Sequence, residues 1–248
     1  MILPRVASGR FLFATVAIQT ASNSLCTDAG IPFNCCTGSA SGSCQDASSA
    51  SIEVPAGWTE IQHDTCGSDL TMSLAYRIAQ PGDFDGMLFS WNFLGAGQPS
   101  DSSSCTGFGT PDACCTGTGT GTCPYSTFLG AGGITEVSNV DTITPIENVS
   151  SLCTLDSATL TAPSITTTEN NSLVLLAYGV VGSNDMTEPA GFSLVYKHDI
   201  GGVGVDMANF TSSLVYPTSG TDTGDQISTA TTPGDNLGYQ IGLSPPLP

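Results

Sequence analysis

The sequence has 248 residues, of which 22 are Asp or Glu and only four are Lys or Arg, and its formal net charge is −18. Contacts to phosphates depend on Lys and Arg, so the composition argues against nucleic acid as a partner. No apolar run approaches the roughly 18–20 residues that cross a bilayer as a helix, so we expect no membrane insertion. A hydrophobic content of 40% is enough to supply the core of a folded chain.

The first predicted element is a buried strand over residues 11–19. Residues 11–18 are nearly all apolar and follow Arg5 and Arg10, so a secretory signal peptide is the competing interpretation. The apolar run is short for a signal peptide, and we expect it to stay in the mature chain. Release from the cell by lysis or another route would then bring the protein outside.

The following elements are also predicted to be strands. Residues 70–79, 89–93 and 237–244 alternate apolar and polar side chains, which is typical of a strand with one buried face. Residues 173–181 form a continuous apolar run, which predicts a central strand covered on both faces. No window of 11–18 residues repeats apolar residues at helical spacing, so we expect no helix. Many strands without helices indicate a sandwich or a barrel.

Two parts of the chain share one layout about 134 residues apart. Residues 55–58 (Pro-Ala-Gly-Trp) open a strand that ends at residues 63–64 (His-Asp). Residues 189–192 (Pro-Ala-Gly-Phe) open a strand that ends at residues 198–199 (His-Asp). Each of these strands has an apolar strand before it and an alternating strand after it; these are 11–19 and 70–79 in the first half, and 172–181 and 203–215 in the second. We expect a duplicated sheet whose two halves pack face to face.

Eight of the ten cysteines form two copies of one pattern, which consists of Cys, eight residues, Cys-Cys, seven residues and Cys, 79 positions apart. Disulfides are favoured over zinc, because zinc ligands usually lie two to four residues apart and both histidines lie elsewhere. Adjacent cysteines rarely bond to each other. Each cluster should therefore hold two bridges from its outer cysteines to its central pair, with two connectivities possible. The clusters are Cys26, Cys35, Cys36 and Cys44, and Cys105, Cys114, Cys115 and Cys123.

The two remaining cysteines, Cys66 and Cys153, are expected to pair with each other if oxidised. Disulfides indicate an oxidising compartment outside the cytosol. The clusters lie outside the repeated layout, so we predict one sandwich domain over residues 1–248 with disulfide-stapled loop insertions at about 22–50 and 98–124. Loops carry function more often than the scaffold that holds them.

Few residues suit catalysis. His63 and His198 hold equivalent positions in the two halves, which favours a structural role at strand ends, and no Gly-x-Ser-x-Gly motif accompanies them. Asp83 and Asp85 are the nearest approach to a glycosidase pair, and Asp222 with Asp225 is a weaker one. All four aspartates lie in Gly-bounded turns, where Asp commonly bonds to the local backbone. We expect no catalytic residues and no cofactor, and leave calcium at a loop unassigned.

Aromatic side chains offer a different chemistry. They could stack on sugar rings if exposed on one sheet face, but their alternation with polar residues favours burial in the core; they are Trp58, Tyr76, Trp91 and Phe93. Three Asn-x-Ser/Thr sequons, at Asn148, Asn170 and Asn209, matter only in a host that glycosylates.

Several short motifs resemble a broad group of jelly-roll-like β-sandwich domains in tail, fibre and surface proteins of bacteriophages and in bacterial surface proteins. The motifs are residues 9–14 (Gly-Arg-Phe-Leu-Phe-Ala), 55–59 (Pro-Ala-Gly-Trp-Thr), 75–79 (Ala-Tyr-Arg-Ile-Ala) and 89–91 (Phe-Ser-Trp), followed by 162–167, 172–175 and 239–245 in the second half. The Cys-Cys-Thr-Gly insertions are similar to loops in virion-associated proteins of environmental phages.

The resemblance implies a fold and a setting but no active site. Such domains usually begin with another strand before the Gly-Arg-Phe-Leu-Phe-Ala segment, which here follows only residues 1–8. The resemblance therefore implies either an open sheet edge or an edge filled by a neighbouring subunit.

We therefore predict a non-catalytic structural or adhesive protein of a virus particle, either capsid decoration or a tail or fibre component. It would be virion-bound or extracellular, homo-oligomeric, and in contact with other virion proteins or with a host-surface glycan. The alternatives are a secreted carbohydrate-binding module or bacterial adhesin, and a glycan depolymerase that uses Asp83 and Asp85.

Overall fold

A computed structural model describes residues 9–19, 42–43, 51–67, 70–81, 83, 89–94, 105–106, 116–117, 120–121, 129–182, 185–200 and 207–246. These residues form strands and no helix, so the prediction of an all-β fold is confirmed. None of the described residues forms a helix long and apolar enough to span a membrane.

The chain divides into two compact units, which are described separately. One unit comprises residues 1–19, 54–92 and 129–248, and the other comprises residues 20–53 and 93–128. The second unit contains both predicted insertions. It holds the short strands β2 (Gly42–Ser43), β3 (Ser51–Glu53), β7 (Cys105–Thr106), β8 (Thr116–Gly117) and β9 (Thr120–Gly121), together with most of β6 (Asn92–Leu94).

Backbone pairing joins the two cysteine-bearing segments to each other. β2, from the first segment, pairs antiparallel with β8, from the second, with Gly42 opposite Gly117. β7 pairs with β9 inside the second segment, and β3 pairs with β6. The two loops are therefore parts of one unit, although 79 positions separate their repeated cysteines.

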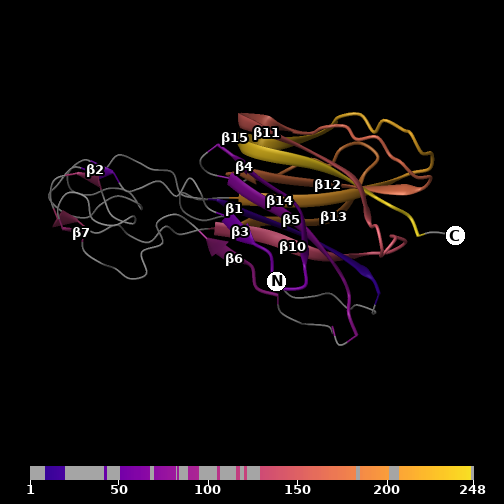
Figure 1. Ribbon diagram of the computed structural model, residues 1–248. Coiled ribbons are helices and arrows are strands. Elements are labelled where there is room, and N and C mark those ends of the chain that lie inside the picture. The colour runs from indigo at the N-terminus through magenta and orange to yellow at the C-terminus, as the bar shows by residue number, and fades with distance from the viewer. Residues whose placement is uncertain are drawn as a thin grey trace. The chain divides into compact units, whose positions relative to one another are not determined.

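The larger unit is built from two antiparallel sheets (Figure 1). The first sheet has the order β10-β1-β5-β4 and consists of β1 (Phe11–Gln19), β4 (Thr59–Cys66), β5 (Leu70–Ile78) and β10 (Leu129–Val137). The second has the order β11-β15-β12-β14-β13 and consists of β11 (Ile146–Ala162), β12 (Ser172–Val181), β13 (Ser193–Ile200), β14 (Met207–Tyr216) and β15 (Gln226–Leu243). Each sheet is thus formed by one half of the chain.

The two sheets repeat one arrangement, because β15-β12-β14-β13 has the same order of strand roles as β10-β1-β5-β4. Equivalent bulges interrupt the outer hairpins, between Glu60 and Gln62 in β4 and between Leu194 and Tyr196 in β13. When the two sheets are aligned on these bulges, the registers define which residues hold equivalent positions in the two halves. The equivalent residues are Phe11 and Leu173, Phe13 and Leu175, Tyr76 and Ser213, Ile78 and Val215, Thr135 and Ile241, Glu136 and Gly242, and Val137 and Leu243.

The turn that opens β4 is repeated before β13. Gly57 and Gly191 have φ values of 83° and 86°, which favour glycine. The residue after each glycine donates its N–H to the carbonyl of the proline three residues earlier, at 3.1 Å and 3.2 Å. These are the features of a type II turn. Trp58 and Phe192, which follow the turns, are each buried against the outer face of their own sheet.

The main core lies between the two sheets. It includes Phe11, Phe13 and Met72 from the first sheet and Leu175 and Tyr239 from the second, all of them at most 1% exposed. Side chains from both sheets therefore share one interior, which is the arrangement of a β-sandwich. The prediction of two related halves that pack face to face is supported by this interior and by the matching registers.

Outer layers explain why some strands are more buried than predicted. The pattern of residues 70–79 predicts a strand with one exposed face, but residues 70–75 are buried on both faces. Trp58 and Phe89 cover the outer face of this sheet, and Ser73 donates a 3.1 Å hydrogen bond to Glu60. The prediction of a strand over residues 89–93 holds only for Asn92 and Phe93, which lie in β6. Phe89 lies outside that strand and packs edge-on against Trp58, with 5.4 Å between ring centroids.

β11 and β15 cover the outer face of their own sheet. The register between them shifts between Thr154 and Thr159. Beyond this shift, residues 159–162 of β11 and 226–229 of β15 pair with each other and fold over the outer face of the sheet. Gln240, in the proximal half of β15, donates its side-chain amide to the carbonyl oxygen of Ala162 at the end of β11, at 2.9 Å. Residues 237–243 are consequently buried on both faces, whereas their alternating sequence predicts one exposed face.

A disulfide between Cys66 and Cys153 confirms the predicted pairing of these two cysteines. Cys66 ends β4 in the first sheet, and Cys153 lies in β11 of the second, so the bond ties the two sheets together along one edge of the sandwich. The side chains of the other eight cysteines lie outside the described residues.

Candidate functional site

A groove of about 570 Å³ lies where the ends of the two sheets meet. Thr135 and Val137 of β10 form one wall, and Leu173 of β12, Val195 of β13 and Val215 of β14 form much of the rest. β10 is the edge strand of the first sheet. The groove therefore combines apolar side chains with a sheet edge, and both can contribute to binding an extended chain.

The repeat explains why space remains in this groove. The groove is lined by Leu173, Leu175, Ser213 and Val215. Their equivalents in the other half, Phe11, Phe13, Tyr76 and Ile78, pack into the core. Each of these four groove residues is smaller than its equivalent. At the equivalent place, β11 also supplies Ile146 and Val149 to the core.

A second hollow, of about 380 Å³, adjoins the groove and shares Asn171, Pro245 and Pro246 with it. Asp141 lies in its wall and accepts hydrogen bonds from the N–H groups of Ile143 and Thr144 and from the Thr144 hydroxyl. These hydrogen bonds lower the pKa of Asp141, with the one from Ile143 contributing most. The carboxylate therefore holds the loop between β10 and β11 in place.

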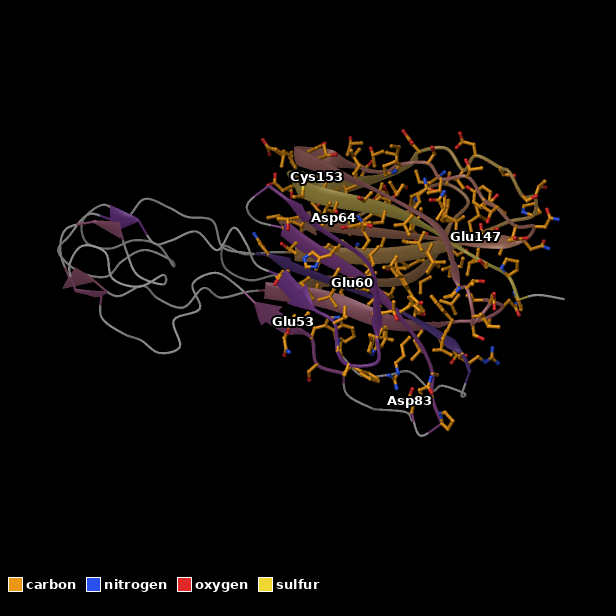
Figure 2. The ribbon with its side chains drawn as sticks, in the orientation of Figure 1. Glu53, Glu60, Asp64, Asp83, Glu147 and Cys153 are labelled. Atoms are coloured by element: carbon orange, nitrogen blue, oxygen red, sulfur yellow. A yellow bond between two sulfur atoms is a disulfide. The ribbon has the colours of Figure 1, made fainter. Side chains whose placement is uncertain are left out.

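Asp83, the first of the predicted carboxylate pair, forms an ion pair with Arg77 in β5, with 3.0 Å between Oδ1 and Nη2. It also accepts the N–H of Gln80 at 2.8 Å. Burial alone would raise its pKa, but the Arg77 hydrogen bond, the Gln80 hydrogen bond and the Arg77 charge together lower it. Figure 2 shows Asp83 on its turn, well apart from Glu60 and Asp64 on β4. Its proposed partner, Asp85, lies outside the described residues.

The weaker pair, Asp222 and Asp225, is used in turns. Asp222 accepts the N–H of Gly224 at 2.9 Å, and Asp225 accepts the N–H of Ser164 at 2.9 Å. Both bonds fix local backbone, as expected for Asp in a Gly-bounded turn.

The two histidines are not equivalent, which corrects the prediction made from the repeat. His63 lies opposite Ser73, and the matching position in the second half is Lys197 opposite Phe210, whereas His198 lies one residue later, opposite Asn209. A shift of one residue along a strand moves a side chain to the other face. His63 lies 3.1 Å from Glu60, and His198 packs beside Tyr196 with 5.5 Å between ring centroids.

Of the aromatic residues predicted to be buried, Trp58 is buried, and Tyr76 and Trp91 are partly buried. Trp58 is 7% exposed and packs against Phe89 and Trp91, with ring centroids 5.4 Å and 5.3 Å away. Tyr76 stacks on Phe11 at 5.4 Å. These described side chains form no exposed strip for sugar stacking, and the side chain of Phe93 lies outside the described residues.

Tyrosine hydroxyls bring polar groups into the sandwich interior. Tyr196 reaches across from β13 to the first sheet, where its hydroxyl bonds to Thr15 and donates to the carbonyl of Gly133 at 3.3 Å. Tyr239 is fully buried, and burial together with the nearby Asp64 carboxylate raises its pKa. Burial likewise raises the pKa of Tyr196. The Tyr196 hydroxyl therefore links the two sheets. With their raised pKa, both tyrosines stay neutral and offer no acid or base near neutral pH.

The remaining predicted positions add no binding site. No group of three His, Cys, Asp or Glu suitable for a metal ion occurs among the described side chains. Of the sequons, Asn148 and Asn170 lie on the exposed surface, and Asn170 accepts the N–H of Ser219 at 2.9 Å. The sequence alone did not predict the groove. Its signal is that several wall residues are smaller than their equivalents in the other half, and these equivalents are known only from the strand registers.

Comparisons with protein-family models, with curated proteins and with solved structures find no match to this chain.

Proposed function

We propose that this chain is a non-catalytic structural or adhesive protein of a virus particle, acting as capsid decoration or as a tail or fibre component. The observation that carries the proposal is that the aspartates considered as catalytic candidates act as structural links. Asp83 is paired with Arg77, while Asp222 and Asp225 bond to backbone N–H groups. A scaffold whose charged side chains fasten loops suits a binding or assembly role.

The architecture supports a role in contact rather than in turnover. A sandwich with covered faces provides a rigid base, and the cysteine-bearing segments form a second unit through the β2–β8 pairing. The Cys66–Cys153 disulfide suits a protein that works in an oxidising setting such as a virion surface. The finer assignment to the jelly-roll-like domains of phage surface proteins, and the further disulfides of the two clusters, belong to this proposal.

The test is to locate the chain in its source. Particles purified from the native source by density gradient should contain the chain at a fixed stoichiometry to the major capsid protein, measured by quantitative mass spectrometry. Antibody labelling in the electron microscope should mark repeated positions on the particle. Recovery only as a free protein, with none co-purifying with particles, would contradict the proposal.

Glycan binding is the adhesive version of this role. A glycan array probed with the full chain would identify a sugar ligand, and binding that survives Trp91→Ala would place the ligand away from the Trp58–Trp91 cluster. The depolymerase alternative requires turnover of capsular polysaccharide that Asp83→Asn abolishes.

A further inference from the structure

The two halves of the sandwich differ in how one sheet edge is completed. In the second sheet, β11 pairs along the outer edge of β15. The equivalent strand in the first sheet is β10, and among the described residues no strand pairs with its outer edge. The edge of β10 therefore presents backbone N–H and C=O groups on which another strand can add.

β11 shows what an added strand on β10 would look like. Ile146 lies opposite Leu243, Asn148 opposite Gly242 and Val149 opposite Ile241, and a shift of register at Glu147 leaves that residue without an opposite partner. Ile146 and Val149 both pack against the main core. The template is thus an apolar residue, a bulged residue, a polar residue and a second apolar residue.

Residues 3–6 of this chain, Leu-Pro-Arg-Val, have the same pattern. Leu3 and Val6 correspond to the two apolar anchors Ile146 and Val149. Pro4 corresponds to the bulged Glu147, and a bulge is one of the few strand positions that tolerate proline, because no ladder hydrogen bond is lost there. Residues 1–8 lie outside the described residues, so the match is one of sequence to a described template.

The match also places opposite charges together. Arg5 corresponds to Asn148, which lies opposite Gly242 of β15. The residue of β10 equivalent to Gly242 is Glu136, so the added strand would place Arg5 opposite Glu136. Opposite charges directly across two strands stabilise the pairing. Glu136 already has one ion pair, 3.5 Å from Arg10 on its other side.

The polarity of β11 excludes addition of the chain's own first residues. An added strand of this polarity would place Ser8 level with Gly133, whereas Gly9 lies level with Asn139, held by its N–H bond to Ala79 at 2.8 Å. Gly133 and Asn139 are six residues apart along the chain, which in an extended strand is a distance of about 20 Å. The Cα atoms of Ser8 and Gly9 are consecutive and lie only about 3.8 Å apart, so both placements cannot hold within one copy of the chain.

We propose that residues 1–8 of one copy of this chain add as a strand to the outer edge of β10 in a second copy, with Leu3 and Val6 entering the groove and Arg5 facing Glu136. This deepens the proposed structural function and rests on it, since it names how copies join. Each copy carries one arm and one edge, so reciprocal exchange closes a dimer and one-way exchange makes a ring or a filament.

The experiment measures the association of the full chain by sedimentation velocity over a wide concentration range. We expect deletion of residues 1–8 to abolish association. Arg5→Glu and Glu136→Arg should each weaken it about tenfold, because like charges then face each other. Combining both substitutions in one chain should restore most of the lost affinity. Glu188→Arg, which reverses an exposed charge away from β10, is the matched control and should associate normally.

A synthetic peptide of residues 1–8 provides a second measurement that does not depend on assembly. It should bind the chain that lacks residues 1–8, and Glu136→Arg should weaken this binding. Association that is unchanged by the deletion would overturn strand exchange and leave the structural role in place. A full chain that stays monomeric and a peptide that does not bind would overturn the inference as well, whereas absence from particles would overturn the proposed function.

Discussion

The two halves of this sandwich share strand order, bulge positions and turns, yet they differ in how each is completed. The second sheet has β11 on its edge, and a disulfide ties β11 to β4 of the first sheet. The first sheet ends at β10 beside a groove where Leu173, Leu175, Ser213 and Val215 are smaller than their equivalents in the other half. A duplicated sheet can therefore close one side of its sandwich within the chain and leave the other side available to a partner.

The closed side should contribute most to stability. Replacing both Cys66 and Cys153 with alanine removes a bond between residues 87 positions apart, and we expect a loss of about 4 kcal/mol in the free energy of unfolding. Urea unfolding followed by tryptophan fluorescence would measure this loss. A loss below about 1 kcal/mol would mean that packing between β4 and β11 closes this side without the bond.

Equivalent core positions should differ in the same sense. Phe13 lies opposite Tyr76 in the main core, whereas its equivalent Leu175 borders the groove. We expect Phe13→Ala to cost about 4 kcal/mol and Leu175→Ala about 2 kcal/mol, since water can occupy the space beside the groove. Parallel chemical denaturation of the two variants measures the difference, and a larger loss for Leu175→Ala would show that the groove is not an open space in solution.

The described part of the second half has no counterpart of the Arg77–Asp83 ion pair, because the position equivalent to Arg77 is Leu214. Asp83→Asn leaves the guanidinium without its charge partner and should cost about 2 kcal/mol at pH 7. The pKa of Asp83 is below its ordinary value of 3.8, so its stabilisation is present above that pH and is lost as the pH falls through the lower folded value. The stabilities of the two proteins should therefore begin to converge as the pH falls below about 4. A constant difference from pH 7 to pH 2 in denaturation would contradict the assigned role of the carboxylate.

The two turn glycines offer the smallest and most closely matched comparison. An added Cβ meets the Arg77 guanidinium at Gly57, but meets only Leu214 at 3.9 Å at Gly191. Both alanine variants should lose about 1 kcal/mol from the positive φ, and Gly57→Ala should lose more because Arg77 must also move. Thermal unfolding of both variants decides this, and equal losses would show that Arg77 adapts without cost.

Much of the scaffold follows from sequence alone, since apolar runs and alternation mark β1, β5 and β12, and the repeated Pro-Ala-Gly segments mark the two halves. The Cys66–Cys153 pairing also followed from counting the cysteines left over by the two clusters. The outer layers did not follow, because burial of Thr71 and Ser73 depends on segments that are distant in sequence. The groove and the non-equivalence of His63 and His198 depend on register, which one bulge shifts by a residue.

Amide hydrogen exchange, resolved by NMR, tests most directly whether β10 is an open edge and β15 a paired one. In the chain lacking residues 1–8, every second amide of residues 130–137 should exchange quickly, while the amides of residues 236–243 stay protected on both sides. Adding the peptide of residues 1–8 should slow those β10 amides selectively. Equally slow exchange along both strands without the peptide would show that the outer edge of β10 is already covered, and would contradict the account.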